Sequence, residues 1–194
     1  MLVSTIKVHI VISCIICMLL LVVICNSMLI ASAAQGDNNN NNNTNAILKA
    51  IQEGLSADNK YLKAKVTVKG FELNADIPIT SELMAKGLAV KNQLKENEAM
   101  LFVFEESAQH SFWKKDMKFP IDIIWSDSNG TVVHIEHNLQ PCVSILKTGS
   151  SALNCPIYTP DKDSLYVLET VAGFSQKHNV KIGTNVDFYL VSLV

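Results

Sequence analysis

The sequence predicts a mainly β fold: a single antiparallel sandwich-like or barrel-like domain with two or three short helices, preceded by a hydrophobic helix. Short stretches of alternating or wholly apolar residues recur after residue 61, and only brief helical patterns separate them. Aromatic and β-branched residues flank a Gly-containing turn at residues 127–130, which is typical of a β-hairpin. Strands and long helices do not alternate, as they would in a parallel sheet.

A hydrophobic segment precedes this domain. Residues 10–25 carry no charge, and Lys7 is the only Lys or Arg before them. Two alternatives fit residues 1–34: a signal peptide cleaved near the A-x-A pattern at residues 31–33, and an uncleaved membrane anchor that leaves Lys7 inside. Both alternatives place the domain outside the cytoplasm, either secreted or held at the membrane through this segment.

A linker with a short helix is predicted over residues 35–60. Six consecutive Asn residues at 38–43 form a polar stretch with nothing to bury. Apolar residues at helical spacing follow within residues 46–57, and Asn45 suits the N-cap of that helix. Asn42 begins an Asn-Asn-Thr sequon, so glycosylation is expected where the host has the machinery.

The β domain is predicted over residues 61–194. Residues 99–104 are apolar throughout, which indicates a central strand buried on both faces. Short helices are expected at residues 81–86 and 170–178. The other strands are expected at residues 63–70, 71–78, 109–114, 121–125, 131–135, 164–169 and 185–193.

The hairpin has a predicted register. Asp127 is expected to cap a type I turn, with Gly130 in the left-handed conformation that Gly adopts most easily. This three-residue connection would pair Asp127 with Thr131, and further along Trp125 with Val133, Ile123 with Ile135 and Asp122 with Glu136. One face of the hairpin would then belong to the core. The other face would carry the polar residues Asp122, His134 and Glu136.

This mixed face of the hairpin is one candidate site. In the predicted register, the carboxylates of Asp122 and Glu136 lie opposite each other, beside His134. Such a pair could hold a hard cation, or share a proton so that one carboxyl becomes a general acid. The alternative is a solvated face on which His134 pairs loosely with an acid, because exposed faces of mixed charge are common.

A second candidate site follows the aromatic pair Phe112 and Trp113. Trp113 could stack on a sugar or another ligand, while Lys115 and Asp116 fix that ligand by hydrogen bonds. The alternative is that one aromatic ring packs in the core and the other covers the mouth of a barrel. The pattern alone leaves both alternatives open.

A disulfide between Cys142 and Cys155 is also predicted. They are the cysteines of the predicted β domain, and a bridge persists outside the cytoplasm. It would hold the intervening loop and Tyr158 over the hairpin, where the face containing Asp122 could form a pocket. Free thiols, a pair of metal ligands and a reactive Cys142 are the alternatives.

Several segments resemble a known family in their order and spacing over about residues 66–191. They are KGL (86–88), EAMLFVFEE (98–106), HSFWKKDMKFPIDIIW (110–125), DSNGTVVHI (127–135), CPIY (155–158), YVLE (166–169) and VKIG (180–183). These segments resemble the uncharacterised family called domain of unknown function 192. The resemblance implies an all-β sandwich-like fold, frequent export signals and no established activity. The chain departs from the family pattern at Ala89, Lys114 and Asp116. Lys114 and Ala89 replace Met, which weakens a Cu(I) site because thioethers select that ion.

Composition and motifs exclude several classes of function. The formal net charge is -2, so nucleic-acid binding has no electrostatic basis. Because no Gly-rich phosphate loop and no compact zinc pattern occur, we expect no cofactor and no bound metal. The leading prediction is a binding or accessory module of the cell envelope whose partner is an envelope protein or a glycan. The alternative is an enzyme, such as a metal-dependent hydrolase, that uses Asp122, His134 and Glu136.

Overall fold

The computed structural model describes residues 40–49, 61–142 and 155–191. The chain divides into two compact units, residues 1–39 and residues 40–194, and all described residues belong to the second. The predicted signal peptide or anchor, with its hydrophobic helix, therefore lies outside the described residues. Within the described ranges, no helix has the length and apolar character needed to cross a membrane.

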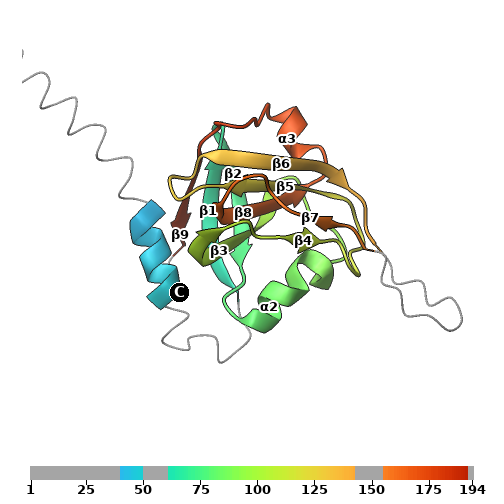
Figure 1. Cartoon of the computed structure of the whole chain (residues 1–194), viewed down its shortest axis with the longest axis horizontal. Coiled ribbons are helices and arrows are strands. Elements are labelled where there is room, and N and C mark those ends of the chain that lie inside the picture. The colour runs from blue at the N-terminus through green and yellow to red at the C-terminus, as the bar shows by residue number, and fades with distance from the viewer. Residues whose placement is uncertain (1–39, 50–60, 143–154, 192–194) are drawn as a thin grey trace, which may run out of the picture. The chain divides into compact units, whose positions relative to one another are not determined.

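One mixed sheet of seven strands forms the framework of the second unit (Figure 1). Every neighbouring pair is antiparallel except β2 and β3, which are parallel. A separate two-stranded sheet contains β4 (Phe112–Trp113) and β7 (Ile157–Tyr158). Across the large sheet the order is β6 (Val132–Leu139), β5 (Ile121–Ser126), β8 (Ser164–Val171), β3 (Glu98–Ala108), β2 (Phe71–Ile77), β1 (Leu62–Val68) and β9 (Val186–Leu190).

A short helical crossover accounts for the parallel pair. The helix α2 (Ser81–Lys86) and the 3-10 helix η1 (Gly87–Val90) carry the chain from the end of β2 to the start of β3. A further short helix, α3 (Phe174–Lys177), follows β8. The predicted mainly β fold with few short helices is confirmed, whereas the sheet is mixed and not wholly antiparallel.

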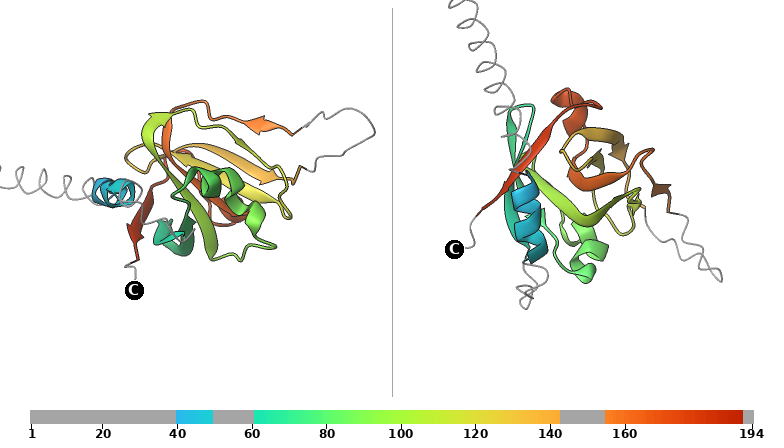
Figure 2. Two further views of the ribbon diagram at one scale, coloured as in Figure 1. Left: turned by 90° about the horizontal axis from the view of Figure 1, so that it is seen from below. Right: turned by 60° about the vertical axis from the view of Figure 1, so that its left-hand side comes forward.

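The sheet curves so that its two edges meet at one end (Figure 2). Val186 N donates to Gly130 O at 2.8 Å, and Val132 N donates to Thr184 O at 2.8 Å. These bonds join the β6 edge to the segment that enters β9. Gly130 has φ of 78°, and a Cβ at this position would lie 2.4 Å from Val186 O. The close approach of the two edges therefore requires glycine at this turn.

The apolar core lies on both sides of the central strands. Adjacent residues of β3 belong to different buried clusters, because side chains alternate along a strand: Leu101 packs with Leu168, and Phe102 packs on the other side with Trp125. Residues 99–103 are all buried, which confirms the predicted central strand. The Phe102 cluster is the one that borders the cavity described below.

The predicted hairpin register is wrong, although the predicted turn is correct. Asp127 N donates to Thr131 O at 2.9 Å, as the three-residue connection requires. The ladder then shifts at a β-bulge, so that Trp125 pairs with His134 and not with Val133. The extra residue puts Val133 and His134 on one side of the hairpin: Val133 packs against the cluster of Trp125, and the His134 ring lies 5.3 Å from the Trp125 ring.

Residues 40–49 form a helix that overlaps the predicted helix at residues 46–49 and extends into the Asn-rich stretch predicted to be a linker, and its side chains bind β9. The side-chain amide of Asn40 donates to Val186 O at 3.4 Å and accepts from Phe188 N at 3.3 Å. Asn43 donates to Phe188 O at 2.7 Å. These amides satisfy backbone groups on the outer edge of β9, as another strand would. The Asn run thus has a structural partner that its composition does not indicate.

The same helical segment reaches the core. Ile47 is fully buried, and the Thr44 hydroxyl lies 2.7 Å from the Tyr166 hydroxyl. Burial raises the pKa of the Tyr166 hydroxyl above its usual value, so the group stays neutral and able to donate. Residues 50–60, the remainder of the predicted linker and its helix, lie outside the described residues.

Replacing Asn40 with Ala should lower the free energy of unfolding by about 1–3 kcal/mol, because the backbone N–H of Phe188 loses its acceptor. Asn41→Ala is the matched control, since Asn41 is exposed on the same helix and Ala favours helix. Urea unfolding followed by circular dichroism measures both variants. Equal losses in the two variants would contradict an edge-capping role for Asn40.

Candidate functional site

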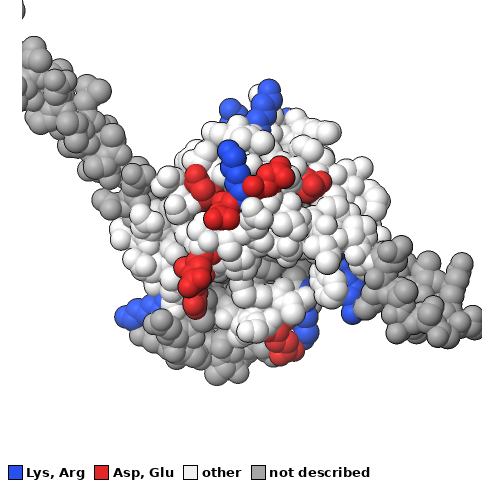
Figure 3. Space-filling view, in the orientation of Figure 1, with Lys and Arg blue, Asp and Glu red and all other residues white. Residues whose placement is uncertain are grey.

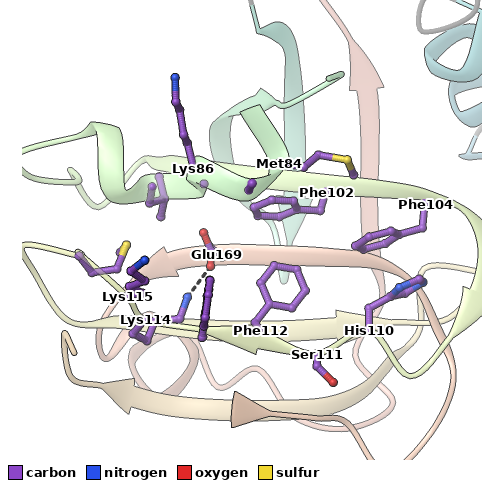
Figure 4. Close-up of a pocket in the computed structure, with 15 residues that line it drawn as sticks. Met84, Lys86, Phe102, Phe104, His110, Ser111, Phe112, Lys114, Lys115 and Glu169 are labelled. Atoms are coloured by element: carbon purple, nitrogen blue, oxygen red, sulfur yellow. Dashed lines mark hydrogen bonds and ion pairs between the residues drawn. The ribbon is translucent and has the colours of Figure 1, made fainter. Parts of the chain in front are cut away.

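A cavity of about 280 Å³ opens beside α2, β3 and β4 (Figure 4). The residues around Gly87 line one side, Phe102 and Phe104 of β3 line another, and Phe112 and Trp113 of β4 line a third. A concave site with apolar walls and few polar groups is typical of small-ligand pockets. The polar lining residues are Lys86, His110, Ser111, Lys114, Lys115 and Glu169.

Aromatic rings form the walls of this cavity. Phe102 and Phe104 are two residues apart on β3, so both side chains point to the same side of the strand. Phe112 packs edge-on against Phe102 with the ring centroids 5.0 Å apart, and it contacts Trp125 in the same way at 5.9 Å. His110 stacks on Phe104 at 3.5 Å. The rings support one another, so the walls are fixed by packing.

A buried ion pair forms the polar part of the cavity. Lys114 Nζ lies 2.5 Å from Glu169 Oε1, and the two side chains are only 2% and 3% exposed. Glu169 belongs to β8, and Lys114 follows β4 directly. The ammonium also lies 5.9 Å from the centroid of the Phe112 ring. Each charge has its counter-ion, as burial in an apolar environment requires.

One oxygen of this pair has no hydrogen-bond partner among the described residues. Glu169 Oε2 is buried, and none of the described residues donates a hydrogen bond to it. A Cβ at Gly87 would lie 3.8 Å from Oε2 and 3.6 Å from Phe102 Cζ, so a larger side chain would enter the space beside the carboxylate. A buried acceptor without a donor costs about 1–3 kcal/mol. Oε2 is therefore a point at which an N–H or O–H group of a ligand would be stabilised.

Two further lysines lie at the rim. Lys86 Nζ is 2.6 Å from Glu82 Oε1, and this carboxylate raises the pKa of Lys86 above its usual value. Figure 4 shows the Lys86 side chain pointing away from Glu169. Lys115 Nζ lies 5.5 Å from the centroid of the Trp113 ring. The rim cations thus contact their own partners, and Lys114 is the counter-ion of Glu169 among the described residues.

Four of the predicted ligand-binding residues lie at or near the cavity. Trp113 and Lys115 line it, and Trp113 is 48% exposed. Asp116 Oδ2 lies 4.0 Å from Lys115 Nζ. Tyr158 of β7 pairs with Phe112 of β4, behind the wall. Lys115, with Asp116 beside it, therefore lies at the rim of the cavity, whereas Lys114 is buried inside.

The structure does not bring Asp122 together with His134 and Glu136. Asp122 is fully buried. Its carboxylate accepts hydrogen bonds from Asn138 N (2.8 Å), Gly173 N (3.0 Å) and Ser175 N (2.9 Å), and from the Ser175 hydroxyl. These bonds tie β5 to β6 and to the start of α3, so Asp122 is a structural residue.

His134 and Glu136 lie on the other side of the hairpin, because the bulge at Val133 shifts them there. His134 Nε2 is 3.3 Å from Glu136 Oε1, and His134 Nδ1 is 3.3 Å from Asp161 Oδ2. Within residues 40–49, 61–142 and 155–191, no group of three or more His, Cys, Asp or Glu side chains is arranged to hold a metal ion. The alternative hypothesis of a metal site on the hairpin face has no geometric support in this part of the chain.

Cys142 and Cys155 are joined by a disulfide, with their Cα atoms 5.5 Å apart. Cys142 N donates to Lys114 O at 2.8 Å, and Asp116 N donates to Cys142 O at 3.0 Å. Cys155 lies just before β7, which pairs with β4. The bridge thus fastens both sides of the segment that carries Trp113. Residues 143–154 between the cysteines lie outside the described residues.

Lys114 and Glu169 are site residues that the sequence patterns did not identify. Glu169 is a carboxylate within a strand whose residues 166–170 are all buried. An isolated charge in an apolar strand is itself a signal, because buried charges are almost always paired. Its partner is 55 residues away, and no spacing rule connects the two positions.

Replacing Lys114 alone with Met should lower the free energy of unfolding by about 3–5 kcal/mol, because Glu169 would keep a buried charge without a counter-ion. Combining Lys114→Met with Glu169→Leu should recover most of that loss, since apolar residues of similar volume can replace a buried ion pair. Denaturant titration compares the three proteins. A double variant at least as unstable as Lys114→Met would contradict this coupling.

Cys142→Ser should lower the melting temperature by several degrees, because closing a loop of this length stabilises by about 3 kcal/mol in the chain-entropy model. Cys155→Ser should give the same shift, since either change removes the same bridge. Calorimetry measures both, after peptide mapping without reductant has identified the 142–155 cross-link. Complete alkylation of both thiols in the native, unreduced protein would contradict the bridge.

Two solved structures are similar to this chain, and these likenesses show the fold alone. One, described as a "putative transcription regulator" from Sinorhizobium meliloti 1021, is 22% identical with a TM-score of 0.55, and the match covers 66% of this chain and 95% of that one. The other, a protein of unknown function from Novosphingobium aromaticivorans DSM 12444, is 24% identical with a TM-score of 0.55, and the match covers 66% and 84%. No curated protein matches the chain. A family model described as "Uncharacterized ACR" matches residues 64–188, so the chain belongs to the family called domain of unknown function 192.

Proposed function

We propose that this protein is an extracytoplasmic binding module of the cell envelope that holds a small ligand in the cavity beside α2, β3 and β4. The observation that carries the proposal is the buried oxygen Glu169 Oε2, which has no donor among the described residues and lies in a cavity with aromatic walls. Binding supplies the missing donor, and burial of the ligand's apolar surface supplies the rest of the affinity.

The walls favour a ligand with a flat apolar face. Phe102 and Phe112 border the interior, and Trp113 is half exposed at the rim. Aromatic rings in such positions stack on the C–H faces of sugar rings and on other flat groups. A glycan of the envelope combines such faces with many O–H donors, and it is the ligand class that we favour.

Two features support a location outside the cytoplasm. The uncharged segment over residues 10–25 has the composition of an export signal or membrane anchor. The bridge between Cys142 and Cys155 fits an oxidising compartment, because thiols stay reduced in the cytosol. The module would then be secreted, or held at the membrane through residues 1–34.

A DNA-binding role has less support, although the Sinorhizobium protein is described as a transcription regulator. The net charge of this chain is -2, whereas proteins that bind nucleic acid concentrate positive charge on one face. On the face in Figure 3, Lys and acidic side chains are interspersed. We therefore propose a small molecule or glycan, and not a nucleic acid, as the ligand.

Calorimetric titration of the full-length protein in mild detergent with a panel of envelope saccharides, free monosaccharides and amino acids tests the proposal. At least one saccharide should bind. Trp113→Ala removes an exposed stacking face and Phe102→Ala removes part of the buried apolar wall, so each should weaken that binding roughly tenfold or more, as expected for an apolar contact worth about 1.5–3 kcal/mol. Ile182→Ala is the matched control, because Ile182 is exposed and does not line the cavity.

Two results would count against this function. One is the absence of binding across the panel. The other is binding that Phe102→Ala and Trp113→Ala leave unchanged while both variants keep the cooperative thermal unfolding of the folded protein. Binding that is lost equally in Ile182→Ala would point to a surface other than the cavity.

A further inference from the structure

We infer that Lys114 and Glu169 determine which ligand the cavity accepts, and that they select neutral rings with neighbouring hydroxyl groups over charged ones. This inference rests on the proposed binding function and specifies its ligand chemistry. The pair presents a donor and an acceptor side by side: the ammonium of Lys114 on Oε1 of Glu169, and the buried oxygen Oε2, to which no described residue donates. Two adjacent hydroxyls match this arrangement, because one donates to Oε2 while its neighbour accepts from Lys114 Nζ.

The donor side of the pair has spare capacity. A Lys ammonium carries three N–H groups, and among the described residues the one hydrogen-bond partner of Lys114 Nζ is Glu169 Oε1. The remaining polar interaction of this ammonium is with the Phe112 ring, 5.9 Å from its centroid. A ligand oxygen can therefore accept from Lys114 without breaking the ion pair.

The charge of the pair excludes charged ligands. Lys114 and Glu169 neutralise each other, and both are buried. A carboxylate or ammonium that entered beside them would lose its hydration, and neither member of the pair would be left over as its counter-ion. Lys86, the cation from α2, is bound to Glu82 and points away from Glu169 (Figure 4). Neutral hydroxyls lose far less hydration, and two adjacent hydroxyls regain one donated bond to Glu169 Oε2 and one accepted bond from Lys114 Nζ.

Sets of sugars that share one ring but differ in charge separate the effect of ligand charge from the effect of ring shape. Glucose, glucosamine and glucuronate form one set, with a neutral, a cationic and an anionic member, and the galactose and mannose series supply two more. In calorimetric titration of the full-length protein, the neutral member of the best set should bind roughly tenfold or more tightly than both charged members, as expected when a charge is buried without a counter-ion. Nicotinamide is a flat ring that carries a primary amide. The amide is also neutral and places an N–H donor beside a C=O acceptor, so it tests whether hydroxyls are preferred over another group of this kind.

Changes to Glu169 and to the ligand test whether the contact between them causes the selectivity. Glu169→Gln keeps the shape of the side chain but loses its charge and one acceptor, so binding of the neutral sugar should weaken roughly 10- to 100-fold. Thermal unfolding confirms that this variant is folded. The mono-deoxy and O-methyl forms of the same sugar, titrated into the unaltered protein, give an independent readout, because each removes one donor from the ligand.

The possible results are distinct. Tighter binding of the neutral sugar, lost in Glu169→Gln and in one deoxy form, supports the inference. Equal or tighter binding of a charged member, tighter binding of nicotinamide, or no effect of Glu169→Gln and of every deoxy form overturns the inference and leaves the binding function standing. If no compound of any class binds, the binding function itself fails, and this inference fails with it.

Discussion

The ion pair between Lys114 and Glu169 is the interaction on which the candidate site depends. β4 does not belong to the large sheet, and its strand partner is the two-residue strand β7. The segment that carries Phe112 and Trp113 is held against the large sheet by the buried Lys114, which reaches Glu169 on β8, and by packing of the Phe112 ring on Phe102 and Trp125. Because breaking a buried pair is costly, this bond fixes one wall of the cavity at a defined distance from the opposite wall on β3.

The sequence predicted the strands well where a pattern is local. The apolar run at residues 99–104 became the central strand β3, and the Asp127 turn formed as expected. The predictions failed where a distant contact decided the structure. A bulge shifted the hairpin, because burial of Val133 and contact of His134 with Trp125 outweigh regular pairing. Residues 40–43 of the Asn run are helical, and the outer edge of β9 offers backbone partners to the amides of Asn40 and Asn43.

The candidate site was predictable only in part, because its interior depends on contacts between residues that are distant in the sequence. Trp113 and Lys115 lie within a few residues of each other, so an aromatic and polar cluster at the rim was visible in the chain. The interior joins Lys114 to Glu169 across 55 residues. No periodicity links these positions, and their pairing follows from the placement of β8 beside β3 in the sheet. Within an apolar strand, a single carboxylate predicts that a partner exists but does not identify it.

Two buried carboxylates in this domain show how structural and functional roles divide. Asp122 accepts four hydrogen bonds from Asn138, Gly173 and Ser175, which satisfy both of its oxygens and leave it nothing to offer a ligand. Glu169 has a counter-ion for its charge, but its buried Oε2 has no donor among the described residues. Folding stability alone would favour a donor from the protein for that oxygen, because an unsatisfied buried acceptor is destabilising. When a ligand donates a hydrogen bond to this acceptor, the destabilisation is removed. The free energy that the unsatisfied oxygen costs the folded protein therefore adds to the affinity for the ligand.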